Sequence, residues 1–319
     1  MPAVHALDAI LRVLPSLDLL PAIEAGFVAH AEGRALVPPV GELLFPDAPG
    51  DAHIKYGHLV GDDVFVIKVA TGFPGNPSRG LPSFSGVMLV FRADTGLLES
   101  VLMDEGHLTN VRTAMAGAIC ARHLAPPDVD RLAVFGTGVQ ARLQVEAIAP
   151  IVGCRKLIVW GRRDEALAAY ASEMAAKGFA VETTRRVAEA ADGARLLVTT
   201  TPSERPLLDD RDVAPGALVI AMGSDTAHKQ ELTAALLGAV DVYVADSVDQ
   251  CATRGELHHA LRAGTRGLAD VIALGDVVRD PARGRRNPQQ RIVADLTGVA
   301  VQDIAIAKAV SRALALPIS

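Results

Sequence analysis

Cysteine is scarce in this chain of 319 residues, which has only Cys120, Cys154 and Cys251. The three lie far apart, with neither metal-ligand nor redox-motif spacing, so we expect buried thiols in a reducing compartment. The nine histidines also lack metal-ligand spacing, and the pair His258-His259 is typical of a helix surface. The sequence therefore predicts no metal site.

A long apolar run and an excess of basic residues are also missing. No stretch approaches the roughly 20 apolar residues of a membrane-spanning helix, and the N-terminus lacks the basic start and apolar core of a signal peptide. The formal net charge is -6, which argues against nucleic acid and anionic membranes as partners because both need a basic face. We expect a cytoplasmic protein that acts on small molecules.

The middle of the chain alternates between short apolar runs and helix-period patterns. The expected strands are 132–135, 157–160, 196–200, 217–222 and 242–245, and the expected helices are 164–177, 185–192, 229–237 and 254–263. Such an alternation predicts an α/β fold with a Rossmann-type, doubly wound parallel sheet.

The flanking segments follow other patterns. Residues 1–35 are helix-periodic, and 51–103 contain four β-rich runs that predict an antiparallel sheet or open barrel. A helix is expected over 108–124, with Thr109 or Asn110 as N-cap and Pro126-Pro127 after its end. The helical tail, 301–316, is expected to pack on the first segment. We predict a discontinuous α+β domain (1–126 with 296–319) and a parallel-sheet domain (127–295).

Two glycines separate strand 132–135 from the helix that follows it. Gly136 permits a tight turn, Gly138 lets backbone approach a pyrophosphate, and Ala141 is small enough for the helix to pack closely on the strand. The N–H groups and positive dipole end of that helix would face phosphate. A second strand follows at βαβ distance, so the pattern predicts dinucleotide binding in preference to a simple turn.

The second strand is followed by Arg162 and Arg163, where an enzyme that prefers NAD usually has an acidic residue for the ribose hydroxyls. Two cations there favour the additional phosphate of NADP over NAD. The alternative is that both arginines face water.

Three cations in the first domain are candidates for anion binding. Lys68 lies in an apolar strand, where it is either an edge residue that reaches water or a pocket cation with a lowered pKa. Lys55 lies thirteen positions earlier, and charge alone does not rank the two. Arg112 is expected near the N-terminus of helix 108–124, where it could hold a carboxylate or phosphate, or lie on the surface.

Asp225 follows the apolar run 217–222, at the edge of a parallel sheet where ligands bind. A carboxylate there could act as a general base or activate water. The alternative is a helix cap for the segment that begins at Lys229.

In combination, several motifs resemble the ornithine cyclodeaminase/mu-crystallin family, in the same order over nearly the whole chain. They are Lys68, Gly80-Leu-Pro82, Leu108-Thr-Asn-Val-Arg-Thr113, Gly136-Thr-Gly-Val-Gln-Ala141, Gly223-Ser-Asp225, Lys229-Gln-Glu-Leu232 and Gly298-Val-Ala-Val-Gln-Asp303. The resemblance implies a substrate-binding and dimerisation domain made from both chain ends, a Rossmann domain between them, and a homodimer. It implies cyclodeamination of a small amino acid with ammonia loss, or NAD(P)H-dependent imine (ketimine) reduction or amino acid dehydrogenation. A mu-crystallin-like NADPH-dependent ligand carrier is the alternative of another class.

The resemblance also implies roles for single residues. Lys68 and Arg112 match the family's substrate-carboxylate binders, and Asp225 matches its acid/base residue. The expected catalytic residues are thus Asp225 and Lys68, and the expected substrate contacts are Arg112, Lys68 and Lys55. The expected cofactor contacts are Ser83, Arg112, Gly136, Thr137, Gly138, Gln140, Ala141, Arg162, Arg163, Thr201, Met222, Gly223, Ser224, Lys229, Leu296 and Thr297.

Two positions depart from the family pattern. Lys55 stands where the cyclodeaminase has a carboxylate for ornithine's distal amine, and a cation there disfavours ornithine. A neutral, acidic or acylated side chain suits Lys55 better. The segment Val37-Pro-Pro-Val40 lacks the arginine with which relatives help to grip the carboxylate. The variant His53-Ile-Lys-Tyr-Gly57 resembles the ectoine-utilisation branch.

Overall fold

The computed structural model describes residues 1–316, and its contacts divide the chain into two compact units. The first unit consists of Met1–Thr113 and the tail from Val299, and the second of Ala114–Gly298. The expected boundaries were 126/127 and 295/296. The first boundary differs because α3 (His107–Leu124) is one continuous helix, and Pro126 marks where that helix has ended, not where its contacts change.

The first unit is built on an open seven-stranded sheet with the order β1-β7-β6-β5-β4-β2, and β3 also pairs with β4. The four expected strands are confirmed, whereas β1, β2 and β3 are additional. All neighbours are antiparallel except β1 and β7. The strands are β1 (Ala3–Ala6), β2 (Ala35–Leu36), β3 (Gly41–Phe45), β4 (Gly50–Leu59), β5 (Val64–Gly72), β6 (Phe84–Arg92) and β7 (Leu98–Met103).

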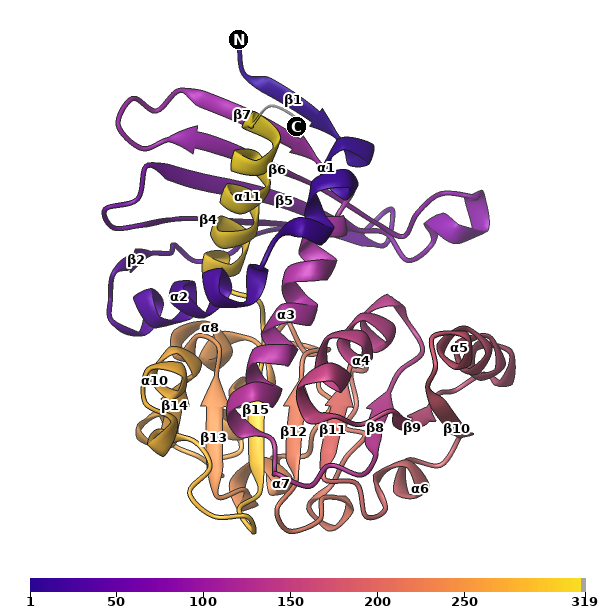
Figure 1. The fold of residues 1–319 in the computed structure, drawn as a ribbon. Coiled ribbons are helices and arrows are strands. Elements are labelled where there is room, and N and C mark those ends of the chain that lie inside the picture. Colours follow the sequence, from indigo (N-terminus) through magenta and orange to yellow (C-terminus); the bar gives the residue numbers. More distant parts are fainter. Residues whose placement is uncertain (317–319) are drawn as a thin grey trace. The chain divides into compact units, whose positions relative to one another are not determined.

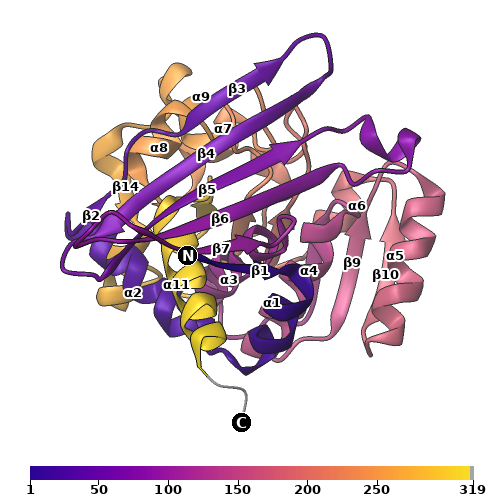
Figure 2. The same ribbon diagram turned by 90° about the horizontal axis from the view of Figure 1, so that it is seen from above.

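One face of this sheet is covered by the tail helix α11 (Ala300–Ala315), which packs on β4, β5, β6 and α2 (Leu19–Ala31) (Figure 2). Alternate β5 residues are buried under it because successive side chains point to opposite faces of a strand. Gly26 allows α2 to approach closely, since a Cβ there would lie 3.2 Å from the Val301 carbonyl oxygen. A short helix, α1 (Leu7–Val13), also contacts α11.

The second unit contains an eight-stranded parallel sheet with the order β10-β9-β8-β11-β12-β15-β13-β14 (Figure 1). The five expected strands are confirmed. The chain runs outward from β8 on one side through β9 and on the other through β11, so a topological switch point lies between β8 and β11. The strands are β8 (Leu132–Phe135), β9 (Lys156–Trp160), β10 (Ala180–Thr184), β11 (Leu196–Thr199), β12 (Leu218–Ala221), β13 (Val242–Ala245), β14 (Val271–Ala273) and β15 (Ile292–Asp295).

Two of the expected helices in this unit differ from the structure. The helix predicted at 229–237 begins later, as α7 (Ala234–Ala239), because the Thr233 hydroxyl caps it by accepting the Leu236 N–H. The helix predicted at 254–263 begins later, at Glu256, because its N-cap Gly255 has a φ of 89°, outside the helical region. The helices are α4 (Val139–Val152), α5 (Asp164–Ala176), α6 (Val187–Ala191), α7, α8 (Val248–Thr253), α9 (Glu256–Arg262) and α10 (Leu274–Arg279).

No helix within residues 1–316 is long and apolar enough to span a lipid bilayer.

Candidate functional site

A buried cluster of three cations and one carboxylate lies in the first unit. We call Lys55, Lys68, Arg112 and Asp303 the cation cluster. The Lys68 Nζ lies 3.2 Å from the Asp303 Oδ2, and the Arg112 Nε donates to the Asp303 Oδ1 at 3.0 Å. The exposed fractions are 7% for Lys55, 2% for Lys68, 5% for Arg112 and 1% for Asp303. One internal carboxylate thus binds two cations that the sequence singled out.

Strand register brings the two lysines together. Lys55 of β4 is directly opposite Lys68 of β5, so both side chains lie on the same face of the sheet, the one that α11 covers. Met88 of β6, which is fully buried, continues this row across the sheet. Because β5 is an inner strand, the alternative of Lys68 as an edge residue that reaches water is wrong.

Arg112 enters the cluster from α3. The helix begins at His107, and the Asp104 carboxylate accepts the Leu108 N–H at 2.9 Å, so the predicted N-caps at 109 and 110 are wrong. Arg112 is therefore in the second turn, not the first. Its Nη1 donates to the Gln302 Oε1 at 2.9 Å. This guanidinium is fixed from two directions by α11 and is not a surface group.

Burial and charge shift the pKa values in this cluster. Burial lowers the pKa of Lys68, the charge of Asp303 opposes this shift, and the charges of Arg112 and Lys55 add to it, which together bring the pKa to about 7. Burial acts to raise the pKa of Asp303, but the surrounding Lys68, Arg112 and Lys55 outweigh it, so the net shift is downward. The cluster therefore holds an ionised carboxylate and a lysine that titrates near neutral pH.

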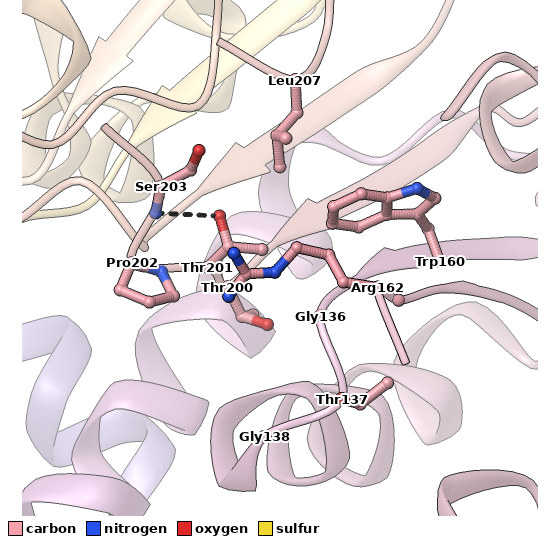
Figure 3. Close-up of a pocket in the computed structure, with 11 residues that line it drawn as sticks. Gly136, Thr137, Gly138, Trp160, Arg162, Thr200, Thr201, Pro202, Ser203 and Leu207 are labelled. Carbon is pink, nitrogen blue, oxygen red and sulfur yellow. Dashed lines mark hydrogen bonds between the residues drawn. The ribbon is translucent and has the colours of Figure 1, made fainter. Parts of the chain in front are cut away.

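A pocket in the second unit opens at the switch point between β8 and β11 (Figure 3). Gly136 follows β8 with a φ of 127°, and a Cβ there would lie 2.5 Å from the Thr200 Oγ1. A Cβ at Gly138 would meet nothing within 4 Å, which leaves open space at the N-terminus of α4. The lining residues are Gly136, Thr137, Gly138, Trp160, Gly161, Arg162, Thr200, Thr201, Pro202, Ser203 and Leu207.

The two arginines after β9 have different surroundings. Arg162 lines the pocket together with Thr201 and Pro202 (Figure 3). Arg163 is exposed, does not line the pocket, and precedes α5 as its N-cap. Both arginines are exposed, and Arg162 is the one of the two that lines the pocket.

Other predicted cofactor contacts are more dispersed. Ala141 is fully buried, and its carbonyl oxygen accepts the Tyr170 hydroxyl at 2.9 Å. Gln140 accepts the Gln144 amide at 3.3 Å and is not a lining residue of the pocket. Ser83 lies in the first unit, where its carbonyl oxygen accepts the Phe73 N–H. The pocket therefore brings together five of the predicted contacts: Gly136, Thr137, Gly138, Arg162 and Thr201.

Asp225 lies in the loop after β12, at the carboxyl edge of the parallel sheet. Its Oδ1 accepts the Lys229 Nζ at 2.7 Å, and its side chain is 38% exposed. The Ser224 hydroxyl donates to the Lys229 carbonyl oxygen at 2.6 Å and closes this loop. Because no helix begins near Lys229, the capping alternative is wrong.

Sequence reasoning missed a set of buried carboxylates along the same edge of the sheet. Asp246 accepts the Thr297 hydroxyl at 3.1 Å and the Gly298 N–H at 2.7 Å, which fixes the turn after Leu296. Burial raises the pKa of Asp295 to about 7. The available signal was an acidic residue beside apolar ones, as in Asp295-Leu296. Glu231 and Glu256 are further missed carboxylates of this unit, and Gln302 and Asp303 are missed buried polar residues of the first unit.

Within residues 1–316, no group of three or more histidine, cysteine, aspartate or glutamate side chains is arranged to hold a metal ion.

Known proteins resemble this chain over almost its full length. The model of the ornithine cyclodeaminase/mu-crystallin family matches residues 2–315. A cyclodeaminase of Sinorhizobium fredii, itself uncharacterised, is 40% identical over 300 residues, which are 93% of this chain and 91% of that protein. An archaeal alanine dehydrogenase dimer solved with NAD has a TM-score of 0.88 at 28% identity, covering 98% of this chain and 95% of the other. The iminosuccinate reductase of Paracoccus denitrificans, solved with NAD+, has a TM-score of 0.85 at 30% identity, covering 98% and 96%.

Proposed function

Because the chain belongs to the ornithine cyclodeaminase/mu-crystallin family, we propose that it is an enzyme of nicotinamide-dependent redox chemistry at the α-carbon of a small amino or imino acid. The observation that carries this proposal is the cation cluster, in which Lys68 and Arg112 already bind a carboxylate. Two buried cations beside one carboxylate are suited to the carboxylate that every α-amino and α-imino acid has.

The residues at the switch point fit a dinucleotide. Gly138 leaves room at the N-terminus of α4, where N–H groups and the helix dipole favour a pyrophosphate. A bound nicotinamide would take up or supply the hydride at the substrate α-carbon. The pocket-lining Gly136, Thr137 and Thr201 would contact the cofactor, and we assign the turn at Leu296-Thr297 to the nicotinamide end.

The roles we propose for the reacting groups follow from their chemistry. Lys68 and Arg112 orient the substrate by its carboxylate, and Asp225 moves a proton at the substrate nitrogen or on an attacking water. Lys229, 2.7 Å from Asp225, holds that carboxylate in one orientation. We further propose that the first unit is the substrate-binding and dimerisation domain of a cytoplasmic homodimer.

Lys55 bears on the choice between cyclodeamination and net redox chemistry. Cyclodeamination of a diamino acid needs a distal amine, which is itself a cation at neutral pH. Lys55 is buried beside Lys68 on the same sheet face, so a distal ammonium group would meet a like charge. We therefore propose a substrate with a neutral, acidic or acylated side chain. We also propose that the enzyme catalyses net reduction or oxidation of this substrate in preference to cyclodeamination.

The experiment that tests this function follows absorbance at 340 nm and ammonia release together, with amino acids plus NAD(P)+ and imino acids plus NAD(P)H. We expect a net change in nicotinamide absorbance with at least one acid that lacks a distal amine. Ammonia release without a net absorbance change would instead indicate cyclodeamination. Nucleotide binding with no turnover of any acid would contradict an enzyme and favour a ligand carrier.

For the cofactor we propose NADP in preference to NAD, supported by Arg162 in the pocket and by the lack of an acidic residue among the residues that line it. Replacing Arg162 by alanine is expected to weaken NADPH binding about tenfold or more, because the guanidinium pairs with the additional phosphate. NADH binding should change by less than threefold. Arg163→Ala is the matched control, since this neighbouring arginine does not line the pocket. Equal losses for both nucleotides in Arg162→Ala would refute the assignment.

A further inference from the structure

Glu231 is a fully buried carboxylate that receives four hydrogen bonds from two neighbouring strand ends. Its Oε1 accepts the N–H and the hydroxyl of Thr201, at 2.6 and 2.7 Å. Its Oε2 accepts the Thr199 hydroxyl at 2.7 Å and the Gly223 N–H at 2.8 Å. The carboxylate therefore links the end of β11 to the loop after β12.

The two linked segments are those to which the proposed function assigns cofactor and proton chemistry. Thr201 lines the nucleotide pocket (Figure 3), and Gly223 lies two residues before Asp225. The segments approach so closely at Glu231 that a Cβ on Gly223 would lie 2.1 Å from the Thr201 carbonyl oxygen. A displacement of either segment would thus disturb the other.

The main chain of Glu231 is also fixed by hydrogen bonds. Its N–H donates to the Glu256 Oε1 at 2.7 Å, and its carbonyl oxygen accepts the N–H groups of Leu207 and Leu208, at 2.6 and 3.1 Å. Leu207 also lines the nucleotide pocket. Burial raises the pKa of Glu231, while the bonds from Thr199, Thr201 and Gly223 oppose that shift. The main chain on which this carboxylate is carried is therefore fixed through both its N–H and its carbonyl oxygen.

We propose that Glu231 is a positioning residue. It fixes the main chain at Thr201, in the pocket wall, relative to the loop that contains Asp225. The proposal extends the proposed function, since it assumes that the pocket binds a nicotinamide nucleotide. Glu231 touches neither substrate nor cofactor in this scheme. It acts through the Thr201 hydroxyl and through the main-chain N–H groups of Thr201 and Gly223, which have fixed directions and cannot turn toward a new acceptor.

The test is Glu231→Gln, in which one of the two acceptor oxygens becomes an NH₂ donor. We expect NADPH affinity to fall about tenfold and kcat to fall by a similar factor, with the KM of the acid substrate within twofold. NADPH alone can be titrated without turnover, because Trp160 is the only tryptophan of the chain and lines the pocket, so its fluorescence reports binding. Leu237→Ala, buried in α7 and outside both loops, controls for lost stability.

A double-mutant cycle with Thr201→Val separates positioning from general stability. If Glu231 acts through Thr201, the double variant should bind NADPH about as weakly as the weaker single variant. Unchanged NADPH affinity and kcat in a folded Glu231→Gln protein, or fully additive losses in the cycle, would overturn the proposal. Failure of the wild-type protein to bind NADPH or NADH would instead refute the proposed function.

Discussion

Asp225→Asn is expected to lower kcat by about 10²–10⁴-fold, the range that one general acid or base contributes. Asparagine keeps the shape of the side chain and can still accept a hydrogen bond from Lys229, which lies 2.7 Å from the carboxylate. It cannot take up or release a proton. NADPH affinity, measured through Trp160 fluorescence, should stay within about twofold because Asp225 does not line the nucleotide pocket.

The control for this variant is Asp249→Asn, which removes the charge of an exposed acid in α8 of the same unit. It should leave kcat and NADPH affinity unchanged. If Asp225→Asn retains wild-type kcat over the full pH range, the residue has no part in proton transfer. Lys229→Met is then the next variant to measure, since this residue is the paired cation.

The strands that sequence patterns predicted well are those buried on both faces. The expected ranges 132–135 and 242–245 match β8 and β13 residue for residue, because a doubly covered parallel strand is an uninterrupted apolar run. β10 has mainly exposed residues at the sheet edge, so it has no such pattern. β2 is only two residues long and depends on its partner β4.

The parts of the site that could be predicted are those made by residues close together in the sequence. The turn at 136–141 is contiguous, and its glycines, strand and helix can be recognised without any tertiary information. The partner of Arg112 could not be found in this way, since Asp303 is 191 residues further along the chain. Nothing at either position specifies the pairing, which depends on α11 packing against the first sheet. Glu231 was missed for the same reason.

The internal carboxylate changes how the two predicted substrate cations should be understood. Lys68 and Arg112 are not unpaired charges, because the Asp303 carboxylate forms an ion pair with each of them. Without Asp303, three cations would remain buried side by side. Burial and the charges of Arg112 and Lys55 lower the pKa of Lys68, and the opposing charge of Asp303 would be gone, so Lys68 would lose its proton more easily. Asp303 therefore favours the charged form of Lys68, which is the form that binds a substrate carboxylate.

Substrate binding should therefore depend on pH through the protonation of Lys68. With the pKa of Lys68 near 7, the wild-type KM for the acid substrate should rise above that pH, by up to about tenfold per pH unit. Asp303→Asn removes the charge that raises this pKa, so the rise should begin at a lower pH, and KM at pH 7 should increase about tenfold or more. Loss of one partner from a buried ion pair should also cost about 3–5 kcal/mol of folding free energy.

Lys68→Arg distinguishes titration of this side chain from other causes, because a guanidinium stays protonated throughout the accessible pH range. In that variant the KM should no longer rise above pH 7, whatever its absolute value. Over the same pH range, the free energy of unfolding of the wild-type protein should increase while substrate binding weakens. The folded-state pKa of Lys68 is below the unfolded value of 10.5, so the unfolded chain binds more protons and folding is favoured as pH rises from 7 to 10.5. A KM that is flat across this range in the wild type would show that titration of Lys68 does not control substrate binding.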